Sequence, residues 1–208
     1  MHALAGTFPF FDRPLVLASE SPRRRFLLDL VGFEYTVIKP SVNEDEHAED
    51  EPAAYVLGLS KMKASSVARN LDSGLVLGAD TIVVLGDDIL GKPHDEEEAF
   101  RMLARLSGVW HEVFTGLAVI DAATGEEARG YERTRVRIRC MVAEEIRSYI
   151  ATGEPMDKAG AYGIQGYGAA IVEAVEGCYF NVVGLPVVRL LHLLRELGGQ
   201  AGGESHGG

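Results

Sequence analysis

Cysteine and long apolar runs are scarce in this sequence of 208 residues. Its two cysteines, Cys140 and Cys178, lack a metal-binding spacing, and both lie in apolar, strand-like segments. We therefore expect two buried free thiols and a cytoplasmic location rather than a disulfide and a secretory route. No apolar run is long enough to span a membrane, and residues 1–11 lack the features of a signal peptide. No membrane partner is expected.

Positive charge is also in deficit. Lysine and arginine number 20 against 31 aspartates and glutamates, which gives a net charge of -11. A general nucleic-acid binder needs a dominant basic surface, so this balance argues against that class. The chain also lacks four short motifs of common nucleotide-binding and hydrolytic sites: the P-loop GxxxxGK[ST], GxGxxG after a strand, HExxH and GxSxG. A phosphate-handling site in this chain would therefore be of a less common type.

The chain has no internal repeat and no linker. We expect one two-lobed catalytic domain over residues 13–197, an N-terminal extension over 1–12 and a flexible Gly-rich tail over 198–208. Hydrophobic periodicity predicts strands over 15–18, 33–38, 75–85, 89–93, 113–120 and 131–140, and a final hairpin of 171–175 and 179–183. Helices are expected over 22–31, 52–70, 95–106 and 144–151, and from residue 186.

Positive charge is concentrated at one helix start, Ser19–Arg25. Ser21 is a suitable N-cap, and Pro22 fits the first helical position. The first turn of a helix favours acidic residues, yet this one carries three arginines. A bound polyanion would explain the exception, because backbone N–H groups, serine hydroxyls and arginine forks can converge on phosphate oxygens. The plainer alternative is that the arginines extend into solvent.

Two charged residues lie among apolar neighbours. Lys63 falls on the apolar stripe of its helix, so it either snorkels to the rim or points into a cleft. Asp80 interrupts an apolar β run, which is costly unless it faces a cation, a cleft or a hydrogen-bond network. Gly78 permits close approach of a ligand or of another backbone. Asp80 is therefore the best candidate for a catalytic or metal-binding carboxylate, with a structural aspartate as the alternative.

Further candidates lie in turns and loops. Lys92 follows a hairpin turn and is by default a surface lysine. The acidic stretch 43–51 is a solvated loop unless one carboxylate, such as Glu44, binds a cation. The Gly-rich segment 154–166, with Lys158 and Gln165, is long and polar, as functional loops are.

A row of arginines alternates with apolar residues along the strand expected over 131–140: Arg133, Arg135, Arg137 and Arg139. Such a row could bind nucleic acid. No aromatic platform interleaves it and the chain is acidic, so a solvated face fits better.

Cations for phosphates and carboxylates for a divalent metal are thus both present. Several segments match one known family and appear in the same order along the chain: Leu17–Arg24, Gly78–Thr81, Gly91–Pro93, Leu106–Gly108, Asp157–Gly166 and Asn181–Pro186. In these residues the chain resembles the Maf-type nucleoside triphosphate pyrophosphatases, the family first named for septum formation. One departure is Glu20, where the family more often has a small residue.

The resemblance implies an α/β fold, with a mixed twisted sheet, flanking helices and two lobes around a central cleft, similar to inosine triphosphate pyrophosphatase. It implies hydrolysis of a nucleoside triphosphate to the monophosphate and pyrophosphate by a homodimer that uses Mg²⁺ or Mn²⁺. By that likeness Asp80 would be the proton acceptor and would hold the metal with Glu44. Lys63 and Lys92 would assist catalysis at the phosphates. The substrate would contact Ser19, Ser21, Arg23, Arg24, Thr81, Lys158 and Gln165.

The family divides by substrate. The dTTP/UTP branch has Arg after Ser-Pro, Thr after the catalytic Asp and Gln in the Gly-Ile-Gln-Gly loop, as this chain does at Arg23, Thr81 and Gln165. The 7-methyl-GTP branch has Trp, Gln and Glu there. The resemblance therefore implies a dTTP/UTP pyrophosphatase that removes non-standard pyrimidine nucleotides. Two alternatives are a nucleotide-binding regulator of cell division with little turnover and a nucleic-acid-binding protein that uses the arginine row.

Overall fold

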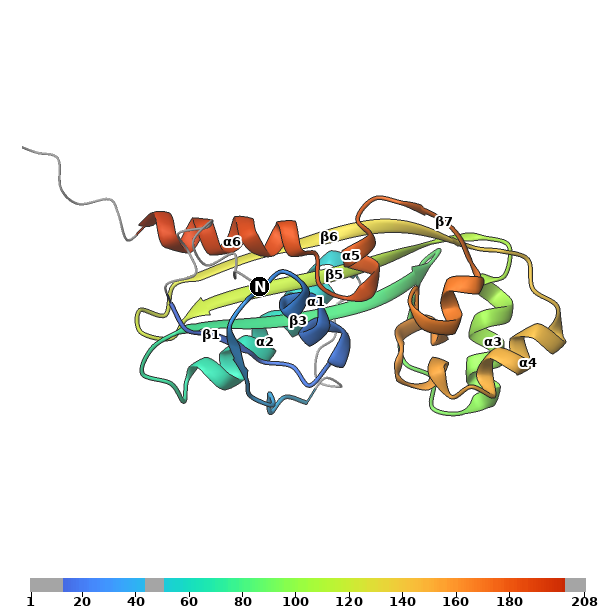
Figure 1. The fold of residues 1–208 in the computed structure, drawn as a ribbon, viewed down its shortest axis with the longest axis horizontal. Helices are drawn as coiled ribbons and strands as arrows, with labels where there is room; N and C mark the ends of the chain where they lie inside the picture. Colours follow the sequence, from blue (N-terminus) through green and yellow to red (C-terminus); the bar gives the residue numbers. More distant parts are fainter. Residues whose placement is uncertain (1–12, 44–50, 201–208) are drawn as a thin grey trace, which may run out of the picture. The chain divides into compact units, whose positions relative to one another are not determined.

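The computed structural model describes residues 13–43 and 51–200, so the candidate Glu44 lies outside the described residues. Figure 1 shows the chain as strands and helices interspersed along the sequence. The elements are β1 (Leu15–Leu17), α1 (Pro22–Leu30), β2 (Tyr35–Val37), α2 (Pro52–Ala68), β3 (Leu75–Leu85), β4 (Asp88–Leu90), α3 (Glu96–Leu106), β5 (Trp110–Asp121), β6 (Glu127–Ile138), α4 (Ala143–Ile150), β7 (Val172–Glu176), α5 (Tyr179–Val183) and α6 (Val187–Gln200). Short 3-10 turns cover Glu154–Asp157, Ala159–Ala161 and Gly166–Ala170.

The strands form a mixed sheet in the order β2-β1-β3-β5-β6-β7, with β4 paired to β3. β1 runs parallel to β2 and β3, whereas the pairs β3–β4 and β6–β7 are antiparallel. The expected α/β class, with a mixed sheet and flanking helices, is therefore confirmed. The central cleft stays a prediction. No helix in the described part combines the length and the apolar character that crossing a membrane requires.

The chain divides into two compact units. Unit 1 contains the residues up to Asp80, Gly116–Tyr131 and the residues from Gly184, and unit 2 contains Thr81–Thr115 and Glu132–Val183. In unit 1, a buried apolar cluster joins α2 to the strands through Val16, Ala18, Ala64, Val67, Ala68, Val76, Ala118 and Ile120.

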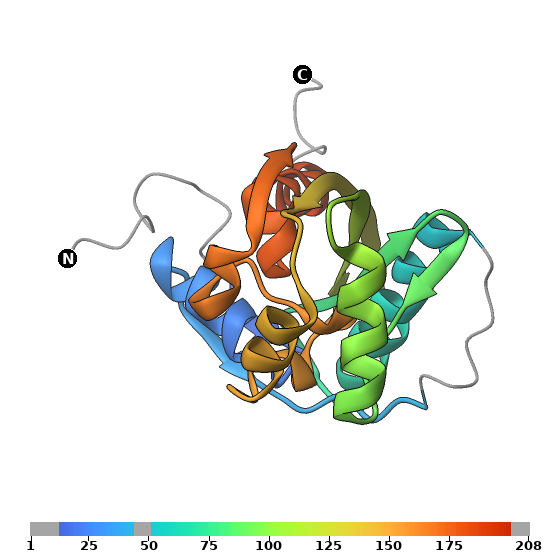
Figure 2. The same ribbon diagram turned by 90° about the vertical axis from the view of Figure 1, so that its right-hand side faces the viewer.

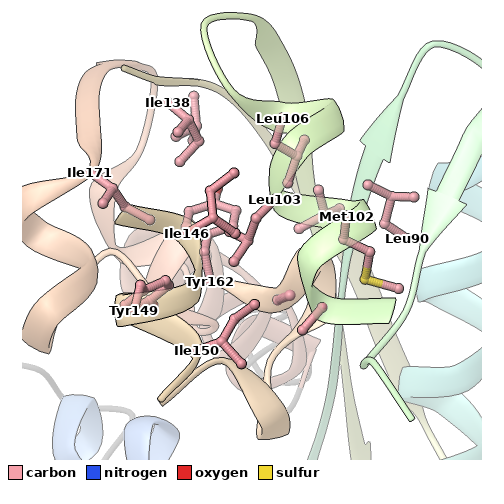
Figure 3. Packing of buried hydrophobic residues seen from close by; sticks show 14 of the residues in the cluster. Leu90, Met102, Leu103, Leu106, Ile138, Ile146, Tyr149, Ile150, Tyr162 and Ile171 are labelled. Atoms are coloured by element: carbon pink, nitrogen blue, oxygen red, sulfur yellow. The ribbon is translucent and has the colours of Figure 1, made fainter. Parts of the chain in front are cut away.

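Unit 2 has a separate apolar core, built on α3 and α4 (Figure 3). In Figure 2, α3 lies beside the short helical turns of residues 154–161. The amphipathic face of α3 supplies Met102, Leu103 and Leu106 to this core, and α4 supplies Ile146 and Ile150. The core thus carries the segment that holds Lys158.

Two glycines set the distance between α2 and the sheet in unit 1. A Cβ on Gly78 would lie 2.1 Å from the Ser60 carbonyl oxygen, and a Cβ on Gly116 would lie 2.3 Å from the Val56 carbonyl oxygen. Both distances are far below contact, so only glycine allows the α2 backbone to lie directly on β3 and β5. Of the two roles open to Gly78, the structure shows close approach of another backbone.

The prediction of a final hairpin is wrong. Tyr179–Val183 forms helix α5, and β7 pairs with β6. The reason is tertiary, because the buried Asn181 side-chain amide donates to the Val113 carbonyl and to Thr134 Oγ1, both at 2.9 Å. These bonds fix the segment and override its β-type composition.

The expected burial of the cysteines is also wrong. Both thiols are free, but Cys140 is exposed and Cys178 is only half-buried. β6 ends at Ile138, so the alternation that buries Val136 and Ile138 stops before it reaches Cys140.

Candidate active site

Lys63 and Asp80 form a buried ion pair in unit 1. The Lys63 ammonium donates to Asp80 Oδ1 at 2.6 Å, and the two side chains are 10% and 11% exposed. Lys63 comes from α2 and Asp80 from β3, which the contact at Gly78 holds together. The structure thus brings two predicted site residues into one pair. The partner of Lys63 in this pair is a carboxylate, whereas the resemblance implied a role at phosphate. The two opposite charges compensate each other where water is scarce.

The arginine-rich turn of unit 1 is only partly as expected. Ser21 occupies the N-cap of α1, but its hydroxyl makes no capping bond. Its backbone N–H donates instead to the buried Ser19 hydroxyl at 3.2 Å. Arg24 turns back into the same unit, where Nε donates to the Gly184 carbonyl and Nη1 to Ser19 Oγ, both at 3.0 Å. The solvent alternative is therefore wrong for Arg24.

Glu20, the departure from the family pattern, lies on the surface. Its carboxylate pairs with Lys39 at 2.8 Å, and both side chains are mostly exposed. This contact raises the pKa of Lys39 through the hydrogen bond to Glu20. The negative charge at Glu20 is thus neutralised by a neighbour beyond β2.

In unit 2, Thr81 is held by a chain of hydrogen bonds. Thr81 Oγ1 lies 2.9 Å from Thr115 Oγ1, and Thr115 donates to the Asn181 carbonyl at 3.0 Å. Thr115 has one hydroxyl proton, which it donates in the hydrogen bond to the Asn181 carbonyl. Thr81 is therefore the donor in the hydrogen bond between the two threonine hydroxyls. No sequence pattern singled out Thr115. Asn181 lies within a matching segment, but no role was expected for its backbone carbonyl.

The remaining candidates of unit 2 differ in exposure. Lys92 is exposed, Gln165 is half-buried, and the Lys158 side chain is 14% exposed. The Lys158 ammonium donates to Asp157 Oδ1 at 2.7 Å. Thr81 and these three residues all belong to unit 2, whereas the residues from Ser19 to Asp80 belong to unit 1.

A divalent cation such as Mg²⁺ needs hard oxygen ligands. The described residues contain no group of three or more His, Cys, Asp or Glu side chains able to hold one. Mg²⁺ does not need such a cage, because it takes one or two carboxylates together with substrate phosphates and water. Asp80 offers a hard oxygen ligand of that kind. The chemistry of this site therefore fits a cation shared with substrate.

The arginine row, which runs along β6 and ends one residue beyond it at Arg139, is neutralised by carboxylates within unit 2. Arg133 pairs with Glu112, and the others pair at 2.6–2.9 Å: Arg135 with Glu176, Arg137 with Glu173 and Arg139 with Glu145. A nucleic acid would have to replace these partners. The nucleic-acid alternative thus loses the feature that suggested it.

His111 of β5 forms a buried pair with Tyr162, with Nε2 2.7 Å from the tyrosine hydroxyl. Burial lowers the pKa of His111 to about 4, with partial opposition from the Val109 backbone. The unfolded chain binds a proton at this histidine below about pH 6.5 and the folded chain does not, so stability falls as the pH drops from 6.5 to 4. We expect His111 to account for about 2 kcal/mol of lost stability between pH 7.5 and 5.

Urea unfolding at both pH values, on wild type and His111→Gln, measures this loss. The variant should lack that part of the pH dependence while keeping contributions from the carboxylates. Equal pH dependence in the two proteins would show that His111 is not held neutral.

A family model described as Maf-like protein matches residues 14–197. The chain is 48% identical over 186 residues to a dTTP/UTP pyrophosphatase of Desulforamulus reducens. The aligned residues make up 89% of this chain and 97% of the relative. The chain is also 50% identical over 184 residues to a dTTP/UTP pyrophosphatase of Moorella thermoacetica, over 88% of this chain and 95% of that relative. The structure of the Staphylococcus aureus Ham1 protein gives a TM-score of 0.41 at 15% identity, over 61% of this chain and 72% of that one.

Proposed function

Because the chain belongs to the Maf family, we propose that it hydrolyses dTTP and UTP to the corresponding monophosphate and pyrophosphate. The observation that carries this proposal is the 48% identity over 186 residues to a relative named dTTP/UTP pyrophosphatase. The buried pair of Lys63 and Asp80 supports it, because it supplies a carboxylate able to accept a proton.

Asp80 is the proton acceptor in the proposed reaction. Its carboxylate takes a proton from water as the water attacks, and the bond between the α and β phosphates breaks to release pyrophosphate. The Lys63 ammonium, 2.6 Å from Asp80 Oδ1, orients the carboxylate and balances its charge.

The other candidates are assigned to the substrate. Ser19, Ser21 and Arg24 of unit 1, and Lys92 and Lys158 of unit 2, bind phosphate oxygens through hydroxyl, guanidinium and ammonium donors. A Mg²⁺ or Mn²⁺ ion, held by Asp80 and Glu44, would neutralise phosphate charge when bound.

Base selection is assigned to Arg23, Thr81 and Gln165. The hydrogen bond to Thr115 fixes the hydroxyl of Thr81, which supports a role that depends on orientation. We further propose that the protein acts in the cytoplasm as a homodimer and clears modified pyrimidine triphosphates.

Pyrophosphate release from a panel of triphosphates tests the proposal. With Mg²⁺ or Mn²⁺ present, we expect dTTP, UTP, 5-methyl-UTP and pseudo-UTP to exceed CTP and 7-methyl-GTP by about tenfold or more, as one well-placed base contact allows. A preference for 7-methyl-GTP would overturn the assignment of Arg23, Thr81 and Gln165. Release from no triphosphate would overturn the hydrolase proposal and favour a nucleotide-binding regulator.

A further inference from the structure

Glu154 makes the densest set of side-chain hydrogen bonds in the Gly-rich segment of unit 2. Oε1 accepts from the Tyr149 hydroxyl at 2.8 Å and from the Gly168 N–H at 2.9 Å, and Oε2 accepts from the Tyr167 N–H at 2.8 Å. The Tyr149 hydroxyl accepts in turn from the Gly163 N–H at 3.1 Å. Glu154 and Tyr149 thus tie together three backbone donors of the segment.

Gly166 packs against the Glu154 carboxylate, and Gly168 packs against its partner Tyr149 and the Gly163 backbone. Gly166 has φ +66, and a Cβ there would lie 2.3 Å from Glu154 Oε2. A Cβ on Gly168 would lie 1.7 Å from the Gly163 carbonyl oxygen and 3.0 Å from the Tyr149 hydroxyl. These glycines allow the loop to close around Glu154.

The hydrogen bonds within this loop limit how it can bind phosphate. Gly-rich loops often bind anions through unpaired backbone N–H groups. Here the N–H groups of Gly163, Tyr167 and Gly168 already have partners. These three N–H groups are therefore engaged within the loop, and the Lys158 ammonium is the cationic donor that this segment offers to phosphate.

Lys158 is bound to Glu154 through the Glu154 backbone. The Lys158 ammonium donates to the Glu154 backbone carbonyl at 2.5 Å, and its charge lies close enough to the Glu154 carboxylate to lower the pKa of that group. The side-chain stem of Lys158 lies against Gly163, where a Cβ would be 2.8 Å from Lys158 Cε. Gln165 is bracketed by Gly163 on one side and by Gly166 and Tyr167 on the other. The backbone that the Glu154 carboxylate fixes thus lies next to the base candidate Gln165, and the backbone carbonyl of Glu154 binds the phosphate candidate Lys158.

We infer that Glu154, assisted by Tyr149, is a positioning residue that presents Lys158 and Gln165 to the triphosphate. This inference rests on the proposed function. An acidic residue beside a polyanion site weakens binding by repulsion unless its charge is used elsewhere. Here the charge is shared among three donors, and these hydrogen bonds lower the pKa of Glu154 although burial raises it.

Glu154→Gln tests the inference without changing side-chain volume. Glutamine has a single acceptor oxygen, so its NH₂ group must face either Tyr167 N–H or the donors at Oε1. We expect kcat/KM for dTTP to fall about 10–100-fold, mostly through KM, as misplacement of about 1 Å produces. The preference for dTTP over CTP should fall too, because Gln165 is displaced. Tyr149→Phe keeps the packing of the ring and removes the two hydrogen bonds of the hydroxyl, to Glu154 and from the Gly163 N–H. We expect it to show a smaller loss in kcat/KM and in the preference for dTTP.

Glu145→Gln is the matched control. Glu145 is a carboxylate of the same unit that also accepts from a backbone N–H, that of Val142, and from a side chain, that of Arg139. It lies outside the Gly-rich segment. We expect a comparable change in melting temperature with unchanged kinetic constants. If Glu154→Gln behaves like Glu145→Gln in KM and in selectivity, Glu154 has only a structural role and the inference is wrong.

Amide hydrogen exchange separates this inference from the proposed function. The amides of Tyr167 and Gly168 should exchange slowly in wild type, and at least one of them should exchange about tenfold faster or more in Glu154→Gln, because glutamine keeps only one acceptor oxygen. Unchanged exchange would overturn the positioning role even if dTTP hydrolysis is found. Faster exchange in a protein that hydrolyses no triphosphate would support the hold of Glu154 on the loop and reject the proposed function.

Discussion

Replacing Asp80 with asparagine is expected to lower pyrophosphate release from dTTP by about 10³-fold or more, while nucleotide binding stays within about tenfold. A positioned general base typically contributes 10²–10⁴-fold, and asparagine cannot accept the proton. Its amide oxygen can still accept the hydrogen bond that Lys63 now donates to Asp80 at 2.6 Å. Single-turnover release and equilibrium binding of dTTP measure the two quantities separately.

Asp80→Asn also leaves the Lys63 ammonium without its counter-charge, so a folding defect has to be separated from a chemical one. Breaking a buried ion pair on one side typically costs about 3–5 kcal/mol. The double variant Lys63→Met/Asp80→Asn holds neither charge and should recover part of that stability. If Asp80 is the proton acceptor, the double variant stays inactive. Restored turnover there, or single-variant activity within about tenfold of wild type, would show that Asp80 only neutralises Lys63.

The sequence predicted the members of the Lys63–Asp80 pair but not the pair itself. Each residue broke a local rule, since a charge stood where the pattern required an apolar side chain. Their contact depends on how closely α2 lies on β3, and that distance is set by Gly78 and Gly116, which belong to different strands. Hydrophobic periodicity reports which face is buried and carries no information about interlayer distance.

Other residues escaped prediction because their roles depend on tertiary contacts. The β-type composition of Tyr179–Val183 predicted a strand, but the buried amide of Asn181 holds it as a helix. Glu154 was placed in the Gly-rich segment 154–166 but was given no role, because its partners Tyr149, Tyr167 and Gly168 are brought together only by the fold. The glycines at positions 166 and 168 were the available signal, since they permit close packing around a side chain as well as around a ligand.

The second large effect is expected from the smallest substitution in unit 1, Gly78→Ala. The added Cβ would lie 2.1 Å from the Ser60 carbonyl oxygen and 2.7 Å from the Ala64 backbone nitrogen, so α2 has to move away from β3 by about 1 Å or more. Backbone atoms cannot rotate aside as a side chain can. We expect a loss of about 3 kcal/mol in the free energy of unfolding, at the upper end of overpacking costs. The shift also separates Lys63 from Asp80, so kcat of the folded protein should fall by about 10²-fold.

Gly198→Ala is the matched control for this change. Gly198 lies in α6, and a Cβ there meets nothing within 4 Å. Alanine in a helix with open space around it should leave stability unchanged or raise it by up to about 1 kcal/mol. Urea unfolding of both variants, with kcat measured at full saturation and corrected for the folded fraction, compares them directly. Equal unfolding curves would mean that α2 is free to shift without cost. A Gly78→Ala protein that loses stability but keeps its kcat would show that turnover does not depend on the 2.6 Å contact between Lys63 and Asp80.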